Sequence, residues 1–205
     1  MDRFKFRFIW IWKKTTAQPV NKKMPLAELE LIAVYSKRKS CLKDLTFNWK
    51  EIAERGEPYR RTFDRQNGTR KQIKPYVSES DGIRYPRQIL NFPSKCNLPE
   101  LERTDHPTQK PIAICGYILK ALSNEGDLIL DPFTGSGSIP IACHRLARRC
   151  IAIERDPGFY AESVKRLNNE LQQGNLFAKN ETSRARLNDP GQIRVNVPVL
   201  AKNRL

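Results

Sequence analysis

The most constraining feature of this sequence is a short apolar run that ends in an acidic residue and a glycine-rich turn. Residues 127–131 read Asp-Leu-Ile-Leu-Asp, and residues 132–138 read Pro-Phe-Thr-Gly-Ser-Gly-Ser. The run predicts a buried strand, and residues 137–147 have the spacing of a helix. Glycine lets the backbone turn tightly near a ligand, and a helix start offers free amides. The segment therefore predicts a strand–turn–helix unit with a ligand at its turn.

Similar elements surround this unit on both sides. Residues 111–122 predict a helix, with Thr108 as its cap and Pro111 in its first turn. Residues 150–154 predict another strand, and residues 157–171 predict another helix. Strands that alternate with helices indicate an α/β fold with a mostly parallel sheet and helices on both faces.

The first hundred residues have a different texture. Aromatic residues occupy every second position of residues 4–12, which predicts a strand, and residues 30–35 predict a second strand after a basic loop at 13–23. Residues 50–59 predict a short helix within a stretch that prolines interrupt. The chain turns polar after residue 173, and we expect a poorly ordered tail there.

The charge of the chain is unevenly distributed. Its 205 residues carry a net charge of +15, and residues 1–100 hold 22 basic against 11 acidic side chains. Such an excess favours a polyanionic partner such as nucleic acid, although a basic protein kept soluble by its charge is about equally compatible. Residues 59–71 interleave bases and aromatics, which suits phosphate contact with base stacking or a solvated insertion.

Several classes of protein are excluded or disfavoured. The chain has no apolar run of about 18 residues, as a membrane span would need, and residues 1–14 do not resemble a secretory signal. The five cysteines are scattered without a matching histidine cluster. We therefore expect reduced thiols, no metal site and a cytoplasmic protein.

The predicted turn also limits the class of ligand. Glu154 ends the second strand, where a carboxylate would hold the ribose hydroxyls of a nucleotide. The turn lacks the full Gly-x-Gly-x-x-Gly pattern of dinucleotide sites, and the chain contains no Gly-Lys-Ser/Thr phosphate loop. An adenosine ligand without phosphates fits better, and S-adenosylmethionine is such a ligand.

Three blocks occur in a recognisable order. They are His-Pro-Thr-Gln-Lys-Pro at 106–111, Asp-Pro-Phe-Thr-Gly-Ser-Gly at 131–137 and Ile-Ala-Ile-Glu-Arg-Asp-Pro-Gly-Phe-Tyr at 151–160. Together they closely resemble the DNA amino-methyltransferases that methylate adenine N6 or cytosine N4, in the circular order where the catalytic motif precedes the cofactor motifs. Residues 11–14, 21–25 and 28–35 resemble phage-like members, so the resemblance covers about residues 8–172.

The resemblance implies a Rossmann-like S-adenosylmethionine-dependent fold and a role in DNA methylation, as in restriction-modification systems. It also implies that residues 40–103 recognise the target in double-stranded DNA, that 104–172 bind S-adenosylmethionine, and that 1–39 belong to the catalytic half. The residues it assigns to the cofactor are Thr108, Gln109, Lys110, Asp131, Phe133, Thr134, Gly135, Ser136, Gly137, Ser138, Glu154, Arg155 and Asp156.

The chain departs from the family in one respect. Members carry a catalytic tetrapeptide, Asp-Pro-Pro-Tyr or a relative, on the loop that receives the flipped base. In this circular order it should lie upstream of Ile11, where residues 1–10 contain nothing similar. Residues 91–94 and 156–160 are poor substitutes, so we assign no catalytic residue and expect an N-terminally truncated enzyme.

Two other functions remain open from the sequence. The chain could be a non-catalytic remnant that still holds DNA or cofactor, because the catalytic motif is absent from it. It could also be an RNA methyltransferase on the same fold, against which only residues 21–25 and 106–111 argue. The adenine or cytosine target, the recognition sequence, the restriction partner and the oligomeric state are not encoded in any of these motifs.

Overall fold

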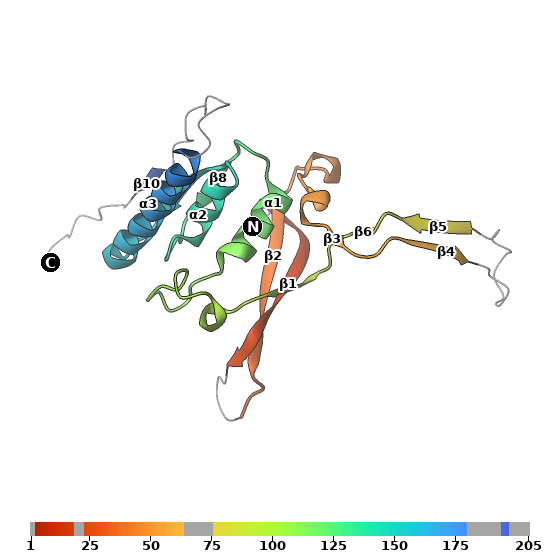
Figure 1. Cartoon of the computed structure of the whole chain (residues 1–205), viewed down its shortest axis with the longest axis horizontal. Coiled ribbons are helices and arrows are strands. Elements are labelled where there is room, and N and C mark those ends of the chain that lie inside the picture. Colours follow the sequence, from red (N-terminus) through yellow and green to blue (C-terminus); the bar gives the residue numbers. More distant parts are fainter. Residues whose placement is uncertain (1–2, 19–22, 64–75, 180–193, 197–205) are drawn as a thin grey trace.

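The computed structural model describes residues 3–18, 23–63, 76–179 and 194–196 (Figure 1). Its helices are α1 (Ile112–Leu122), α2 (Ser138–Arg145) and α3 (Pro157–Lys179), and short 3-10 turns span Leu42–Asp44, Trp49–Ile52 and Lys95–Asn97. Its strands are β1 (Phe4–Gln18), β2 (Ala27–Lys37), β3 (Glu54–Arg55), β4 (Tyr59–Phe63), β5 (Tyr76–Ser80), β6 (Ile83–Arg84), β7 (Ile89–Phe92), β8 (Leu128–Asp131), β9 (Arg149–Ile153) and β10 (Arg194–Asn196).

The cofactor motifs lie on a parallel sheet with the strand order β10-β9-β8. Leu130 pairs with Ile151 and Asp131 with Ala152, so both strands end at the same edge. The helices α1, α2 and α3 follow the sequence prediction closely, but α3 continues to Lys179 and β10 pairs with β9. The polar composition that predicts a poorly ordered tail does not reveal these elements, because strand pairing supplies backbone hydrogen bonds that composition alone does not indicate. The rest of that tail lies outside the described residues.

A second sheet has the order β2-β1-β7, with β1 antiparallel to β2 and parallel to β7. The alternating aromatic pattern correctly predicts β1, and it buries Trp10 and Trp12 to 3% exposure each. The strand runs on to Gln18, so the basic loop expected from residue 13 begins later than predicted. The two three-stranded sheets are thus one parallel and one mixed.

One apolar core joins the two sheets through α1. The ring of Tyr117 on α1 contacts Trp10 of β1 and Phe92 of β7, with centroids 5.9 and 5.6 Å apart. The same core includes residues of α2 and α3 and, from β9, Cys150 and Ala152. Within the described ranges, α1, α2 and α3 all contribute side chains to this core.

The helix α1 begins differently from the prediction. Thr108 does not cap it; instead the backbone N–H of Ile112 donates to Oε1 of Glu102 at 2.8 Å. A carboxylate at this position satisfies a free amide and complements the positive end of the helix dipole. No helix in the described ranges is long and apolar enough to cross a membrane.

The part of the chain that lies between β2 and β7 in the sequence includes a slender arm, which projects from the body of the molecule (Figure 1). Its base is the short pair β3–β6, and its outer part is the antiparallel pair β4–β5. The helix predicted for residues 50–59 is wrong, because the 3-10 turn Trp49–Ile52 leads directly into extended backbone. Gly56 and Pro58 interrupt any helix there, and the strand partners of this segment lie far along the chain.

Candidate functional site

The glycine-rich turn after β8 folds back on itself as a compact loop. The N–H of Phe133 donates to Oδ1 of Asp131 at 3.2 Å, and the N–H of Gly137 donates to the carbonyl of Thr134 at 2.9 Å. Gly135 and Gly137 have φ angles of 50° and 81°. This left-handed backbone conformation favours glycine, which explains the residue type at both positions.

Glu154 ties this turn to the end of β9. Its two carboxylate oxygens accept hydrogen bonds from the N–H groups of Gly135 and Asp156, both at 2.8 Å. The N–H of Thr134 also donates to the carbonyl of Ile153 at 2.9 Å. The two strand ends that are predicted to share a ligand are therefore fixed against each other. Each carboxylate oxygen of Glu154 already accepts one backbone hydrogen bond.

The segment before α1 closes the other side of the turn. The hydroxyl of Ser138 donates to the carbonyl of Lys110 at 2.6 Å. A Cβ atom on Gly135 would lie 2.7 Å from Nε2 of His106, so only glycine lets these two segments approach. The buried amide of Gln109 binds Thr104 and Glu102, which makes it a support of the loop rather than a free ligand contact.

A cavity of about 160 Å³ lies among these segments. It brings together most of the residues expected to bind the cofactor, and His106, Cys115 and Ile139 also line it. The expected residues that line it are Thr108, Gln109, Lys110, Asp131, Phe133, Thr134, Gly135, Ser136 and Ser138. Gly137, Glu154, Arg155 and Asp156 are not among its lining residues.

Of these four, Glu154 ties the turn to the end of β9 as described above, and two more have structural roles. Oδ1 of Asp156 accepts the N–H groups of Gly158 and Phe159 at 2.8 and 3.0 Å, which caps α3. Gly137 begins α2, and a Cβ atom on it would lie 3.0 Å from Cβ of Ser163. Arg155 is exposed beside the site. The segment 156–160, which superficially resembles a catalytic motif, is the start of a helix.

Two polar atoms in this cavity are buried without a hydrogen-bond partner: Oδ2 of Asp131 and Oγ1 of Thr134. Leaving such atoms unpaired costs about 1–3 kcal/mol each, so their presence indicates a place for a polar ligand group. Burial raises the pKa of Asp131 above its usual range. Burial likewise raises the pKa of Cys115 to about 12, so this thiol is not a nucleophile at neutral pH.

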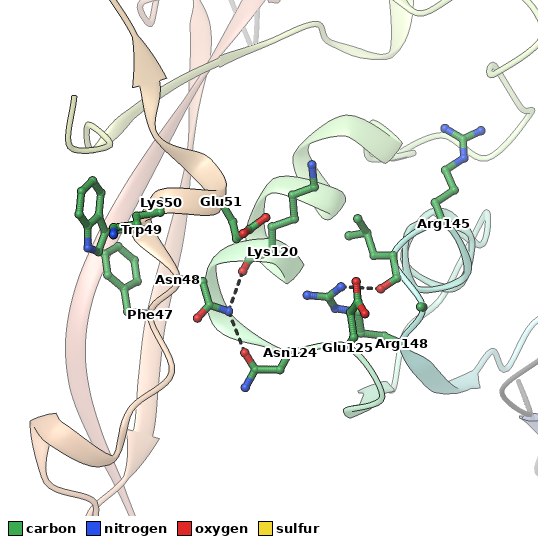
Figure 2. Close-up of a pocket in the computed structure, with 12 residues that line it drawn as sticks. Phe47, Asn48, Trp49, Lys50, Glu51, Lys120, Asn124, Glu125, Arg145 and Arg148 are labelled. Carbon is green, nitrogen blue, oxygen red and sulfur yellow. Dashed lines mark hydrogen bonds between the residues drawn. The ribbon is translucent and has the colours of Figure 1, made fainter. Parts of the chain in front are cut away.

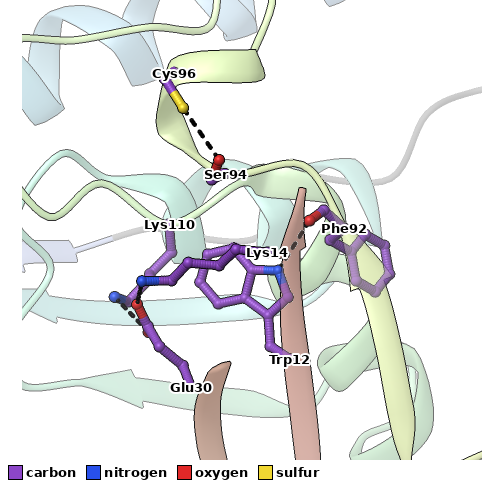
Figure 3. Close-up of polar contacts among 7 residues, drawn as sticks. All are labelled: Trp12, Lys14, Glu30, Phe92, Ser94, Cys96 and Lys110. Carbon is purple, nitrogen blue, oxygen red and sulfur yellow. Dashed lines mark hydrogen bonds and ion pairs between the residues drawn. The ribbon is translucent and has the colours of Figure 1, made fainter. Parts of the chain in front are cut away.

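A charged cluster that no sequence motif indicated lies beside this cavity (Figure 3). Glu30 of β2 binds Nζ of Lys14 at 2.6 Å and Nζ of Lys110 at 2.9 Å. Both ammonium groups also lie over the ring of Trp12, at 5.6 and 5.7 Å from its centroid. Although burial opposes ionisation of Glu30, the two lysines hold the pKa of its carboxyl below the usual range.

This cluster orients Lys110 from the side of the antiparallel hairpin β1–β2, which carries Lys14 and Glu30. The only sign of this cluster in the sequence is that Glu30 occupies an inward-facing position of the alternating strand β2. That position does not indicate which residues pair with its carboxylate. Trp12 is fixed in turn, because its indole N–H donates to the carbonyl of Phe92 at 3.0 Å. The wall of the cavity that holds Lys110 is thus set by residues of the other sheet.

A larger cavity of about 630 Å³ lies elsewhere (Figure 2). It lies at the amino ends of β8 and β9, whereas ligands of open α/β sheets bind at the carboxyl ends. Its polar side chains are already engaged: Nδ2 of Asn48 donates to the carbonyl of Lys120 at 3.2 Å, and Nη2 of Arg148 donates to the carbonyl of Ser123 at 2.9 Å. These contacts join the residue before the 3-10 turn Trp49–Ile52, and the turn after α2, to the end of α1, so this cavity is a structural seam.

The described residues offer no site for a metal ion. No group of three or more His, Cys, Asp or Glu side chains comes together within them. Cys41, Cys96, Cys115, Cys143 and Cys150 are all free thiols.

Comparison with known proteins identifies the family. The family model described as DNA methylase, N6_N4_Mtase, matches residues 1–165. The chain belongs to this N6/N4 DNA methylase family. The family expected from the sequence motifs is therefore confirmed.

Curated relatives of this DNA methylase are type II methyltransferases. M.HpaI of Haemophilus parainfluenzae is 43% identical over 86 residues, which cover 42% of this chain and 27% of that protein. M2.DpnII of Streptococcus pneumoniae is 45% identical over 65 residues, which cover 32% of this chain and 24% of that protein. The matched segments span about a quarter of the length of these relatives.

Solved structures have the same fold as this methylase. A complex of M1.HpyAVI with SAM matches with a TM-score of 0.54 and 26% identity, covering 81% of this chain and 64% of that one. The cytosine-N4-specific PvuII DNA methyltransferase matches with a TM-score of 0.54 and 16% identity, covering 83% and 55%. The Rossmann-like α/β class expected from the sequence is confirmed.

Proposed function

We propose that this chain binds S-adenosylmethionine in the cavity after β8 and is part of an enzyme that methylates an exocyclic amino group of adenine or cytosine in double-stranded DNA. The observation that carries the proposal is the pair of unpartnered buried atoms, Oδ2 of Asp131 and Oγ1 of Thr134, beside the glycine turn. Membership in the N6/N4 DNA methylase family and the likeness to a SAM complex support it.

The residues around the cavity fit this cofactor chemically. S-adenosylmethionine, when bound, supplies a methyl group on a positively charged sulfur. The Asp131 carboxylate and the Thr134 hydroxyl would accept or donate hydrogen bonds at its polar methionine end. Glu154 retains lone pairs for ribose hydroxyls, and the ring of Phe133 is 87% exposed and free to stack on the adenine.

The chain contributes position and electrostatics. The Glu154 clamp and the Ser138–Lys110 bond hold both walls of the cavity before any ligand arrives. A preorganised site avoids the entropic cost of ordering at the moment of reaction. The carboxylates of Asp131 and Glu154 also place negative charge where a sulfonium ligand is favoured.

We infer that residues 40–103 form the target-recognition region, next to a cofactor region at 104–172 and a part of the catalytic half at 1–39. The projecting arm carries Arg61, whose guanidinium lies 4.8 Å from the centroid of the Tyr59 ring. A two-stranded β-ribbon fits the major groove of DNA, and arginine beside an aromatic suits phosphate contact and stacking. Free thiols fit a cytoplasmic location.

A non-catalytic module that binds DNA or cofactor is the second candidate. The observation that favours it is that none of the 14 prolines in the chain stands next to another. A tetrapeptide with two adjacent prolines is therefore absent from these 205 residues. Cofactor affinity is common to both candidates, and only transfer to DNA separates them.

Calorimetry with S-adenosylmethionine tests the site. Asp131→Ala and Glu154→Ala should each weaken binding about tenfold or more, since each removes a polar contact worth roughly 1.4 kcal/mol or more. Glu125→Ala, an exposed carboxylate at the opposite ends of the strands, is the control and should bind like the parent chain. Unchanged affinity in both site variants would contradict the proposal.

Incorporation of labelled methyl from S-adenosylmethionine into unmethylated DNA separates the two candidates. Transfer by the 205-residue chain would establish an enzyme complete in itself. Tight cofactor binding without transfer would establish the binding module.

A further inference from the structure

We propose that a further cavity, beside the base of the projecting arm, binds a small aromatic carboxylate whose anionic group pairs with Arg7 of β1. This cavity has a volume of about 530 Å³, and Tyr85 and Pro86, which follow β6, are among its lining residues. It shares no lining residue with the cofactor cavity. A ligand here is therefore independent of the proposed function.

An irregularity in the pairing of β1 with β2 turns Arg7 toward this cavity. Phe6 pairs with Tyr35 and Phe8 pairs with Val34, so Arg7 is an extra residue without a partner in the ladder. Such a bulge re-aims a side chain. Phe6 lies on the exposed face against Tyr35, whereas Arg7 and Phe8 both line the cavity. The alternation of β1 is thus broken at the residue that carries the charge.

The guanidinium of Arg7 is half-buried and is held by neutral acceptors. Its Nε donates to Oγ of Ser36 at 2.8 Å, and its Nη2 donates to the carbonyl of Ser40 at 2.5 Å. Among the described residues, no carboxylate lies within ion-pair distance of it. Arginine is rarely buried without an acidic partner, because removing its charge from water is costly. The absence of such a partner indicates an anionic ligand.

The other charged side chains of this cavity limit the charge of that ligand. Arg87 is exposed and already lies 3.8 Å from the carboxylate of Glu54. Asp44 accepts the N–H of Cys41 at 3.0 Å, and its own negative charge disfavours a phosphate dianion or a dicarboxylate. A single carboxylate therefore matches the charge of the lining residues.

The walls of the cavity are apolar and include several aromatic rings. Phe8 packs edge-on against Trp10 and Phe47, with centroids 4.9 and 5.7 Å apart, and the ring of Tyr85 lies 6.3 Å from that of Phe47. Rings pack favourably against the edges and faces of other rings. The volume of about 530 Å³ also lies within the range of roughly 300–1,000 Å³ that is typical of ligand pockets. An aromatic body with one carboxylate fits both the walls and the charge.

Calorimetry of the full 205-residue chain with 2-naphthoate and with the neutral 2-naphthamide tests this site. The two probes have the same rings and differ in charge. We expect the carboxylate to bind about tenfold or more tightly than the amide, because hydrogen bonds between charged groups are stronger than neutral ones. In Arg7→Gln this preference should disappear, while the amide keeps its affinity.

Leu42→Glu is a second variant, which leaves Arg7 and its hydrogen bonds in place. Leu42 lines the cavity but is 76% exposed, so its replacement does not disturb the core. A carboxylate there should weaken 2-naphthoate binding about threefold or more by repulsion and by competition for Arg7, without an effect on 2-naphthamide. Leu101→Glu is the matched control, because Leu101 is fully exposed and does not line the cavity.

Each outcome supports or contradicts the site. A preference for the carboxylate that Arg7→Gln removes, that Leu42→Glu weakens and that Leu101→Glu retains would establish it. Equal binding of the two probes, binding of neither, or a preference that persists in Arg7→Gln would overturn it. Binding of the tripeptide Ala-Ala-Phe in place of 2-naphthoate would also overturn it and would assign the cavity to the end of a polypeptide. Binding of S-adenosylmethionine should be the same in all these variants, because the two cavities have no lining residue in common.

Discussion

The mixed sheet β2-β1-β7 and the parallel sheet β10-β9-β8 share a core, but their inward-facing carboxylates have different hydrogen-bond partners. In the mixed sheet, the inward carboxylate of Glu30 is paired with two lysines above a buried tryptophan. In the parallel sheet, the inward carboxylate of Asp131 retains an oxygen without a partner. The first arrangement stabilises the fold, whereas the second leaves a buried polar atom whose partner we propose to be the cofactor.

The packing of the two sheets follows the same division. Strand β1 of the mixed sheet contributes the large rings of Trp10 and Trp12 to the buried core, whereas β9 of the parallel sheet contributes only Cys150 and Ala152. Small residues let α2 lie close to the strands, which brings the start of that helix to the turn. The position of the cavity therefore depends both on the large side chains of β1 and on the close packing of α2 against the small residues of β9.

The largest expected change in stability concerns the mixed sheet, through Trp12 on β1. Trp12→Ala should cost about 3–5 kcal/mol of unfolding free energy, because the ring is buried and its indole N–H is bonded. Urea unfolding measures it, with Leu31→Ala on the exposed side of β2 as the control. A loss as small in Trp12→Ala as in the control would show that the hairpin does not support the core.

Asp131→Asn should separate stability from binding in the parallel half. It should weaken S-adenosylmethionine binding about tenfold or more while raising stability at pH 7, because a buried carboxylate is removed. A raised folded-state pKa means that stability falls as pH rises from the usual aspartate range through the raised value. Urea unfolding at several pH values should find this slope reduced in the variant; an unchanged slope would assign it to other groups.

Glu30→Gln should have the opposite pH signature. The lowered pKa of Glu30 means that its stabilisation is complete above the usual glutamate range and is lost as pH falls through the lowered value. The variant should lose at most about 1 kcal/mol at pH 7, and less in high salt, because the pair is partly exposed. Glu51→Gln, at an exposed carboxylate, is the control. A loss that persists at acid pH would point to packing instead of charge.

The smallest expected effect lies in the turn after α2. Ala147 has a φ angle of 55°, a left-handed conformation that costs a non-glycine residue roughly 1–2 kcal/mol. Ala147→Gly should relieve this strain but loosen the unfolded chain, leaving a net gain of about 0.5 kcal/mol. Thermal unfolding should show a small upward shift in Tm; a downward shift would mean that the methyl group packs favourably.

The sequence predicted the parallel half much better than the rest. Residues 127–138 combine a strand, two glycines and a helix start within twelve positions, so local rules suffice. Residues 50–59, at the base of the arm, were mispredicted as a helix, because Glu54 and Arg55 pair with Arg84 and Ile83, far along the chain. Pairing at that distance leaves no periodic signal.

The candidate site shows the same limit. The cavity-lining residues were accessible from motifs, but the Glu30 cluster was not, since it joins Lys14 and Lys110 across 96 positions of the chain. Likewise, the carbonyl of Glu102, which holds Gln109, and its carboxylate, which accepts the first amide of α1, gave no sequence signal. The residues that line the cavity could be predicted from sequence motifs, whereas the residues that position them could not.

The narrow base of the arm has a consequence for how such chains diversify. The arm leaves and rejoins the body through the pair β3–β6, so a change in its length alters only a loop whose ends are already fixed. The entropic cost of closing a loop grows by only about 0.6 kcal/mol for each doubling of its length. An outer hairpin can therefore be lengthened, shortened or exchanged between relatives while the core keeps its sequence, which makes this position a natural joint for recombination.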